Sequence, residues 1–427
     1  MNNYGVMLDK GDEIQADKEK AATYYKTAAD KGNFESIINY AEMLDIGDGI
    51  PVNKREAAYY YKMAADRGNV KCMFNYATML SEGDGIQIDK EKAVKYYKKA
   101  AKKGDVESMI CIAEMLDNGD GIPVDKPDAS HYYKQAANCG DVRSMFNYAL
   151  MVDSGDGVPI DKEAAARYYK MAAEKNDIKS INNYAMMLKD GDGIPTNKIA
   201  AAYYFEIASE KGDVDSMFNL GLMLKNGDGI QMDKIKASNY LKKAADKGDI
   251  ESAFYYASMC NEGDGIPINK PEAIKYFKIA ADKGEIRSMF NYAYMLRIGD
   301  GVPLNKKEAA VYYKKAADKG DSKSMHTYSL MLKNGDGIPP NQKKSEKYLK
   351  MAADKGHIRA MNSYGLFLSS SNQKRESLKY LKKSADEGCI EAMFNYATIL
   401  NEIDDNEISK SEVIKYFKMA ADNDHDE

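Results

Sequence analysis

The chain of 427 residues has no tryptophan, only four histidines and five cysteines. The histidines are His131, His326, His357 and His425, and their spacing gives neither a set of metal ligands nor a Cys–His pair. The sequence also contains no P-loop and no Rossmann fingerprint. We therefore expect a protein that is not an enzyme and that holds no metal and no cofactor.

Paired cysteines and long apolar segments are absent too. The cysteines are Cys72, Cys111, Cys139, Cys260 and Cys389, which form no recurrent pair, so we expect reduced thiols. No apolar run approaches the ~18 residues of a membrane span, and the first residues do not resemble a signal peptide. These absences favour a cytoplasmic location, with the nucleus as the alternative.

Neither sign of charge dominates the chain. It has 61 Lys and Arg residues against 66 Asp and Glu residues, with a formal net charge of −5, and the two signs are interspersed. A nucleic-acid interface would need a basic face, and attraction to a membrane surface would need a polybasic patch. We expect neither.

What the sequence does contain is a glycine-rich segment that returns at a fixed interval. Gly83-Asp84-Gly85 is followed by the same tripeptide at Gly119 and at Gly155, each time 36 residues further on. The aspartates of these segments are Asp48, Asp84, Asp120, Asp156, Asp192, Asp228, Asp264, Asp300 and Asp336. A fixed period of this length is typical of a stacked repeat array.

Each repeat is predicted to form two helices and no strand. In residues 69–104, apolar residues from Met73 to Leu80 follow the i, i+3, i+4, i+7 spacing of one helix face and predict helix A. Gly83 ends helix A as a left-handed residue, and Asp89 caps a second helix, helix B. The Met and Tyr residues, with an Ala-Ala pair in helix B, are predicted to form the core.

About twelve antiparallel pairs fill the chain, so we expect one continuous all-α solenoid over residues 1–427. The predicted units are 1–32 (incomplete), 33–68, 69–104, 105–140, 141–176, 177–212, 213–248, 249–284, 285–320, 321–356, 357–388 (short) and 389–427. The first unit begins without a polar capping residue, as in a frayed start or in a fragment of a longer chain. The loops at 369–372 and 403–405 have lost the Gly-Asp-Gly sequence.

These features resemble the Sel-one-like repeat (SLR), a relative of the tetratricopeptide repeat. The resemblance rests on the period, the Ala-Ala pair and the loop, for example Met73-Phe74-Asn75-Tyr76-Ala77 followed by Gly83-Asp84-Gly85, and it covers almost the whole chain. It implies a right-handed α/α superhelix with a concave groove, and an adaptor or scaffold function. Some secreted bacterial members bind or hydrolyse β-lactams and carry a disulfide in each repeat, which this chain lacks.

A row of asparagines, here called the asparagine ladder, runs through helix A. Its members are Asn39, Asn75, Asn147, Asn183, Asn219, Asn291 and Asn395. An amide offers one acceptor and two donors, which suits an extended peptide backbone, and inner-helix asparagines of tetratricopeptide proteins face the groove. Two interpretations stay open: the ladder clamps a partner's peptide, or each asparagine bonds the backbone of a neighbouring repeat.

Other helix-A residues would share the face of the ladder. They are the basic Lys71, Arg143, Lys179, Arg287 and Arg359, and the apolar Leu150, Met186, Leu222, Tyr294, Leu330 and Leu366. The residues just before the ladder, Phe74, Phe146, Phe218, Phe254, Phe290 and Phe394, either join this face or complete the packing between helices. An apolar groove with charged edges is a reasonable peptide site.

Two charged rows have simpler interpretations. The loop aspartates lack the ligand spacing of a calcium-binding EF-hand, so we expect them to bond nearby backbone N–H groups in the turn. A lysine row on helix B is predicted to form a solvated outer face. Its members are Lys26, Lys62, Lys98, Lys134, Lys170, Lys242, Lys278, Lys314, Lys350, Lys382 and Lys418.

The sequence thus predicts a non-enzymatic scaffold or adaptor that binds extended segments of other proteins on the concave helix-A face. Nucleic acid, a membrane span, metal and cofactor are not expected. Two alternatives remain: a hydrolase of β-lactams, by the family resemblance, and a calcium-responsive array. Turnover of a chromogenic β-lactam would identify the first alternative, and calcium-dependent melting would identify the second.

Overall fold

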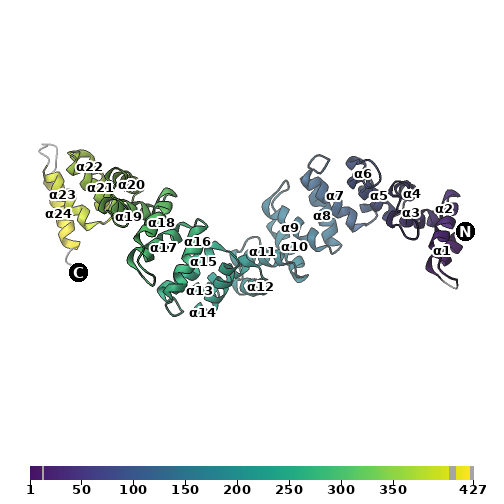
Figure 1. The fold of residues 1–427 in the computed structure, drawn as a ribbon, viewed down its shortest axis with the longest axis horizontal. Helices are drawn as coiled ribbons and strands as arrows, with labels where there is room; N and C mark the ends of the chain where they lie inside the picture. The colour runs from purple at the N-terminus through teal and green to yellow at the C-terminus, as the bar shows by residue number, and fades with distance from the viewer. Residues whose placement is uncertain (12–13, 403–409, 424–427) are drawn as a thin grey trace. The chain divides into compact units, whose positions relative to one another are not determined.

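The computed structural model describes residues 1–11, 14–402 and 410–423, and these residues form 24 α-helices and no strand. The predicted all-α architecture of paired helices is confirmed. Odd-numbered helices are the A helices of successive repeats, and even-numbered helices are the B helices (Figure 1).

The helix bounds follow the predicted period. The A helices are α1 (Asn2–Lys10), α3 (Phe34–Ile46), α5 (Val70–Glu82), α7 (Val106–Asn118), α9 (Val142–Ser154), α11 (Ile178–Asp190), α13 (Val214–Asn226), α15 (Ile250–Glu262), α17 (Ile286–Ile298), α19 (Ser322–Asn334), α21 (Ile358–Ser370) and α23 (Ile390–Asn401). The B helices are α2 (Lys18–Asp30), α4 (Lys54–Asp66), α6 (Lys90–Ala101), α8 (Lys126–Asn138), α10 (Lys162–Glu174), α12 (Lys198–Glu210), α14 (Lys234–Asp246), α16 (Lys270–Asp282), α18 (Lys306–Asp318), α20 (Gln342–Asp354), α22 (Lys374–Asp386) and α24 (Lys410–Asn423).

The chain divides into two compact units, Met1–Asp213 and Val214–Glu427, and each is described by itself. Within each unit, helix A packs along helix B of its own repeat, and helix B packs against helix A of the next repeat. In the first unit these contacts join one buried cluster that runs from Leu8 to Met187. The right-handed superhelical twist stays a prediction.

Local sequence sets the helix ends as predicted. The side chain of Asn69 accepts a hydrogen bond from the Cys72 N–H at 2.8 Å and starts α5. Gly83 ends α5 with φ of 79°, a left-handed conformation that glycine adopts without steric cost. Asn176 takes the glycine position after α10 with φ of 68°, which asparagine tolerates better than most residues.

Two B helices begin with a capping box in which asparagine takes the capping position. The Glu56 N–H donates to Asn53 Oδ1 at 3.1 Å, and the Asn53 amide donates back to Glu56 Oε2 at 3.0 Å. Asn305 and Glu308 exchange the same two hydrogen bonds. Ser409, which precedes the last helix in the sequence, lies outside the described residues, and α1 begins after Met1 without a side-chain cap.

The core combines small and large residues in the predicted way. Ala64 and Ala65 of α4 are buried, which lets neighbouring helices approach closely. Tyr76 of α5 meets Tyr96 of α6 edge to face, with ring centroids 4.9 Å apart, a favoured geometry for aromatic pairs. Equivalent pairs recur through both units, for example Tyr148 with Tyr168 and Tyr292 with Tyr312. The tyrosine and methionine stripes are therefore core.

The Gly-Asp-Gly loop fastens each repeat to the one before it. Lys54, the first residue of α4, places Nζ 2.9 Å from Oδ2 of Asp84 in the next loop. A Cβ on Gly85 would lie 2.3 Å from the Lys54 Cβ, so the loop can approach this closely only through glycine. The same ion pair recurs as Lys18–Asp48, Lys90–Asp120, Lys126–Asp156, Lys162–Asp192, Lys234–Asp264, Lys270–Asp300 and Lys306–Asp336.

This arrangement corrects one prediction. The loop aspartates were expected to bond backbone N–H groups of their own turn, but these carboxylates bind lysines 30 residues earlier in the chain. The turn itself is held by backbone bonds, such as that from the Asp84 N–H to the Met79 carbonyl at 3.2 Å. None of the helices in the described ranges combines the length and the apolarity that a membrane crossing requires.

Candidate functional site

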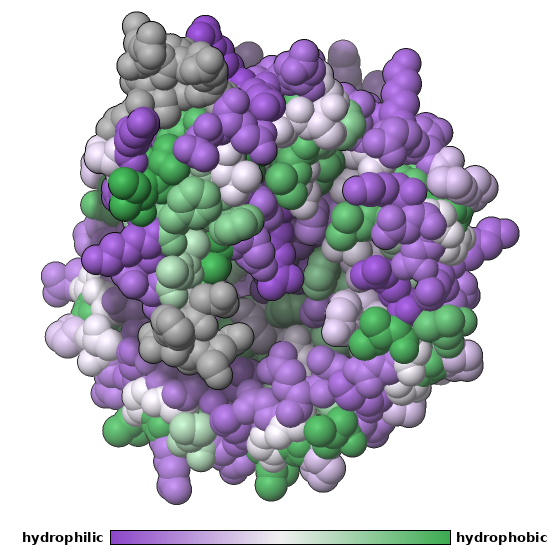
Figure 2. All heavy atoms as spheres, turned by 90° about the vertical axis from the view of Figure 1, so that its left-hand side faces the viewer, coloured by the Kyte–Doolittle hydropathy of each residue, from purple (hydrophilic) through white to green (hydrophobic). Residues whose placement is uncertain are grey.

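Half-exposed apolar side chains mark the helix-A face that the sequence predicted as a groove. Leu150, Tyr294 and Leu366 occupy one position of the repeat and are 44%, 46% and 41% exposed, and Phe394 of α23 is 55% exposed. Figure 2 views the molecule from its C-terminal end and shows apolar patches within a mainly hydrophilic surface. Scattered exposed residues are ordinary, but these three share one helical position, Leu150 in the first unit and Tyr294 and Leu366 in the second.

Basic residues border these apolar positions, and only some of them are paired. Lys71 Nζ lies 2.6 Å from Glu42 of the preceding A helix, and Arg143 pairs with Glu114 in the same way. Lys179 has no acidic residue at that place, and its Nζ lies 5.7 Å from the Phe146 ring centroid. Of the described residues none forms an ion pair with Lys179, so its charge remains available on this face.

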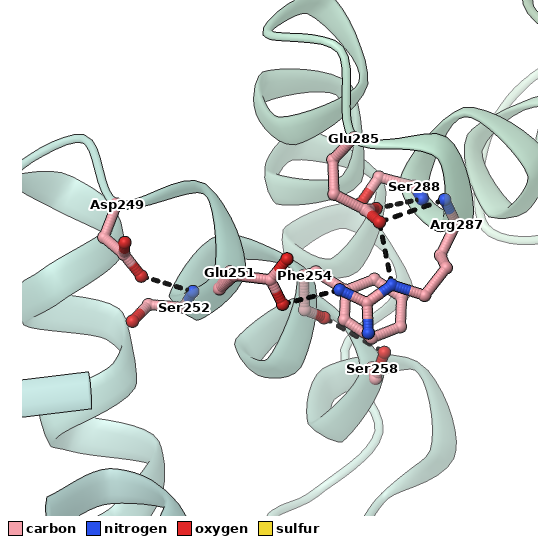
Figure 3. Close-up of polar contacts among 8 residues, drawn as sticks. All are labelled: Asp249, Glu251, Ser252, Phe254, Ser258, Glu285, Arg287 and Ser288. Atoms are coloured by element: carbon pink, nitrogen blue, oxygen red, sulfur yellow. Dashed lines mark hydrogen bonds and ion pairs between the residues drawn. The ribbon is translucent and has the colours of Figure 1, made fainter. Parts of the chain in front are cut away.

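A polar cluster on this face surrounds Arg287 (Figure 3). Its guanidinium lies 3.9 Å from the Phe254 ring centroid and donates to Glu251 at 2.6 Å and Glu285 at 2.8 Å. Glu285 also caps α17 by accepting from the Ser288 N–H. Although burial opposes ionisation, these hydrogen bonds hold the pKa of Glu285 below its usual range. The cluster fixes α15 against α17 and covers one face of Phe254.

All seven asparagines of the ladder are half-buried. In the first unit four of them face a tyrosine of the preceding helix B: Asn39 with Tyr25, Asn75 with Tyr61, Asn147 with Tyr133 and Asn183 with Tyr169. Burial raises the pKa of Tyr25 and of Tyr133 to about 12, and the amides oppose this rise. The ladder thus meets side chains of the neighbouring repeat, which neither interpretation of the sequence included.

The three asparagines of the second unit have different surroundings. The Asn219 amide donates to the Asp215 carbonyl at 2.9 Å, and the Asn395 amide donates to Asn362 Oδ1 at 3.0 Å. Asn291 follows α16, where Phe277 stands in the place of the tyrosine, so no hydroxyl is offered to it. Peptide clamping by the ladder stays a prediction.

The phenylalanines before the ladder pack on helix B of their own repeat. Ring centroids are 5.8 Å apart for Phe74 and Tyr97 and 5.6 Å apart for Phe290 and Tyr313. These rings are only half-buried, so they complete the packing between helices and still present an edge on the helix-A face.

The lysine row of helix B is engaged in ion pairs rather than only solvated. Lys26 reaches Glu56 of the next B helix at 2.9 Å, and Lys98 reaches Asp128 at 2.8 Å. Lys98 Nζ also lies 5.7 Å from the Tyr132 ring centroid. Lysines held in this way offer fewer donors to a phosphate backbone.

The structure brings together two histidines that the sequence analysis treated as unrelated. The rings of His326 in α19 and His357 before α21 lie 4.9 Å apart, and His357 Nδ1 caps α21 by accepting from the Ala360 N–H. Burial, with smaller contributions from His357 and Arg359, lowers the pKa of His326 to about 4. In the described ranges no three His, Cys, Asp or Glu side chains gather closely enough to hold a metal ion.

Two surface pockets lie where the ladder is interrupted. Cys111 takes the asparagine position in α7, and a pocket of about 610 Å³ borders it beside Tyr97. Ser363 takes that position in α21, and a pocket of about 410 Å³ borders it beside Leu349. Sequence reasoning missed both pockets. The signal was present, since each is a departure from the common residue at a fixed position of the repeat.

Comparison with known proteins gives a family. The Sel1 repeat profile matches residues 1–33, 35–69, 70–105, 106–141, 142–177, 178–213, 214–249, 250–285, 286–321, 322–357, 360–389 and 414–425. A search of curated proteins gives no match.

Many solved structures are similar to the chain, and they include the following two. A protective antigen of uropathogenic Escherichia coli strains that displays an SLR fold has a TM-score of 0.74 at 22% identity, over 98% of this chain and 90% of that chain. A Sel1 repeat protein from Oxalobacter formigenes has a TM-score of 0.58 at 24% identity, over 74% of this chain and 90% of that chain. At these identities the likeness shows the fold alone.

Proposed function

Since the chain belongs to the Sel1 repeat family, whose repeats generally mediate protein interactions, we propose that it is a non-enzymatic scaffold that binds extended segments of partner proteins along its helix-A face. The helices form the SLR solenoid that this family shares. The proposal places the protein in a reducing compartment such as the cytoplasm, because its five cysteines are free thiols.

The observation that supports this proposal most is the row of half-exposed apolar side chains at one helix-A position. Tyr294 and Leu366 of the second unit and Leu150 of the first are exposed, and each follows a basic residue two turns earlier in the same helix, Arg287, Arg359 and Arg143. An extended peptide could place alternate side chains on such positions and direct its acidic groups to the bordering cations. Helices of the core offer this surface without any rearrangement.

The asparagine ladder would contribute hydrogen bonds to the peptide backbone. An amide has two N–H donors and one acceptor, and a single contact with a tyrosine hydroxyl leaves further groups unused. Asn75 and Asn147 are half-buried rather than enclosed, so their remaining groups can be reached from the helix-A face.

Affinity capture with the intact chain from its native cells tests the proposal. One variant changes Asn75, Asn147, Asn219 and Asn291 to Ala, and a second changes Leu150, Tyr294 and Leu366 to Ser. A matched control changes Tyr59 and Val311, which are exposed on helices α4 and α18, to Ser. We expect partners identified by mass spectrometry to be lost with the helix-A variants and kept with the control. If all three variants keep their helical content and still capture the same partners, the helix-A face is not the binding site.

No observation favours the two alternatives. The aspartates that calcium would need are already occupied, since Asp48, Asp156 and Asp300 each bind a lysine. A β-lactam hydrolase rests only on the analogy with certain bacterial proteins of the family. Turnover of a chromogenic β-lactam by the purified chain would contradict the proposal.

A further inference from the structure

The loop between α21 and α22 interrupts the regular fastening of repeats in the second unit. In the preceding repeat, Asp336 accepts from Arg297 at 3.1 Å and pairs with Lys306 at 2.7 Å. The loop after α21 has no aspartate at this place and turns through Asn372, with φ of 62°. Lys333, which occupies the position of Arg297, therefore forms no ion pair among the described residues.

Two side chains that fill the space between repeats are also shortened here. Leu349 of α20 stands where the preceding repeat has Tyr313, and Ser363 of α21 stands at the ladder position. The pocket of about 410 Å³ lies at this place, between α19, α20 and α21. Its apolar lining comes from Leu330, Leu349, Leu366 and Phe367. The pocket is therefore the space that a tyrosine side chain at position 349 and part of an asparagine side chain at position 363 would fill.

Some polar groups of the pocket have hydrogen-bond partners among the described residues, whereas a carboxylate does not. Ser345 Oγ donates to the Ser329 carbonyl at 2.7 Å, and Ser329 Oγ donates to the His326 carbonyl at 2.7 Å, so both hydroxyls are used internally. Glu346 also lines the pocket, half-buried, at a position where the preceding repeat has the buried Ala310. Its carboxylate accepts no hydrogen bond and forms no ion pair within the described part of the chain.

We propose that this pocket receives a tyrosine side chain from the extended segment of a partner protein, which deepens, and rests on, the proposed function. The ring fills the space that Leu349 leaves, and the phenol O–H donates to the Glu346 carboxylate. The chain pairs its own tyrosines in this way, since Tyr348 donates to Asp318 at 2.6 Å and Tyr292 to Glu308 at 2.8 Å. A half-buried carboxylate without a donor beside an apolar cavity selects tyrosine over phenylalanine.

The surface next to the pocket can hold the residues that flank this tyrosine. Leu366 also borders a groove of about 820 Å³ whose lining includes Phe394, Asn395 and Phe417. The groove and the pocket therefore adjoin on the helix-A face of α21 and α23. Lys333 at the pocket is free to accept an acidic group or to donate to a peptide carbonyl.

The test restores the residues that other repeats use. The double variant Leu349→Tyr/Ser363→Asn places a tyrosine and an asparagine where Tyr61 and Asn75 stand in the first unit, so it should fill the pocket without disturbing the fold. The probes are acetylated, amidated pentapeptides with Tyr, Phe or Ala between two alanine pairs. Binding to the intact chain is followed by NMR of the leucine methyl groups of Leu330 and Leu366.

We expect the Tyr peptide to shift both methyl signals, the Phe peptide to bind about tenfold more weakly, and the Ala peptide to cause no shift. The filled variant should lose the response to every peptide, with an unchanged circular dichroism spectrum and an equal or higher melting temperature. Glu346→Ala, which copies Ala310, should erase the difference between Tyr and Phe. If the double variant does not fold, Leu349→Tyr alone serves the same purpose.

The pocket proposal is overturned if the Tyr peptide leaves the wild-type signals unchanged or shifts them equally in the filled variant. Its failure can be distinguished from failure of the proposed function. If partners depend on Leu150, Tyr294 and Leu366 and still bind the filled variant normally, that result supports the helix-A face as a binding surface and contradicts the pocket proposal. If the Tyr peptide binds in the pocket but every helix-A variant captures the same partners as the wild-type chain, the pocket proposal is supported and the proposed function is contradicted.

Discussion

Two glycines hold each Gly-Asp-Gly loop for different physical reasons. Gly263 ends α15 with φ of 73°, where any side chain would be strained. Gly265 has φ of 77° and in addition lies against Lys234, so that a Cβ there would come within 2.2 Å of the Lys234 Cβ. Gly356, at the end of α20, has φ of 80° and open space around it. A side chain at Gly356 would therefore meet backbone strain alone, whereas a side chain at Gly265 would meet both strain and a steric clash.

Substitution by alanine should show this difference. We expect Gly356→Ala to lower the free energy of unfolding by about 1 kcal/mol through strain alone. Gly265→Ala should lower it by about 3 kcal/mol, since a clash is added to the strain. Urea denaturation and limited proteolysis near the loop measure both. Equal losses at the two positions would contradict the close approach of the loop to α14.

The buried His326 should make the second unit sensitive to acid. Burial holds its pKa at about 4 in the folded chain, below the ordinary value of about 6.5. The unfolded chain thus binds more protons between these values, so His326 stabilises the fold fully above about pH 6.5 and loses this effect as pH falls toward 4. The charged groups that face the two rings are Asp321, Lys323 and Arg359.

His326→Phe, which copies Phe290 of the preceding repeat, removes this titration. Between pH 7.5 and pH 5 we expect the wild-type chain to lose about 2 kcal/mol more stability than the variant. Melting temperatures of both proteins at the two pH values are the measurement. An identical pH dependence would show that His326 titrates normally in the folded chain.

At the scale of single elements, the sequence predicted where helices end, but it did not predict which side chains of neighbouring repeats contact each other. Asn69, Gly83 and the Asn53–Glu56 box act on backbone groups within a few residues, so the local sequence determines them. The lysines that bind the loop aspartates lie 30 residues away, and the contact follows from the pitch of the stack rather than from local pattern. The tyrosines that face the ladder were missed for the same reason.

The ion pairs that join one repeat to the next should outweigh those within a helix. Lys126 pairs with Asp117 and Asp156 at 2.7 and 2.8 Å, and these carboxylates raise the pKa of Lys126. We expect Lys126→Ala to destabilise the chain by about 1 kcal/mol. Lys62→Ala, which removes a pair with Asp66 inside α4, should cost about 0.3 kcal/mol.

Urea denaturation at low salt measures both lysine variants. The difference between them should shrink in 1 M NaCl, because screening weakens partly exposed pairs. A loss for Lys62→Ala as large as that for Lys126→Ala would mean that the loop is held by its glycines alone.

At the scale of the whole molecule, the same contacts recur at the same spacing within each unit. Tyr60 donates to Asp30 and Tyr96 donates to Asp66, each across 30 residues. Stability in such arrays is a sum of repeat and neighbour contributions. The repeat architecture was therefore predictable from the period alone, whereas the pocket beside Ser363 was not, because it arises where two neighbouring repeats jointly depart from the common residues.

The loop aspartates also determine how the whole chain should respond to calcium. Because each described pair engages a carboxylate with a lysine, calcium would have to displace that lysine, and the described part of the chain holds no cluster of acidic side chains that would compensate. We expect the melting temperature to be the same with 5 mM calcium and with a chelator, within about 1 °C. A rise of several degrees in calcium would restore the calcium-responsive alternative.

The Lys-to-Asp fastening has a consequence for how such a chain can change in length. Within each unit, the regular repeats pair a lysine with the loop of the following repeat and a loop aspartate with the preceding repeat. Removing or duplicating one complete period there leaves each remaining lysine with an aspartate. Unequal recombination between copies of the underlying DNA could therefore add or delete periods without creating a new interface. The junction after α21 is the exception in the second unit, because Lys333 and Gln342 have no Gly-Asp-Gly loop to meet. Repeats on the two sides of that junction are therefore not interchangeable by such a recombination.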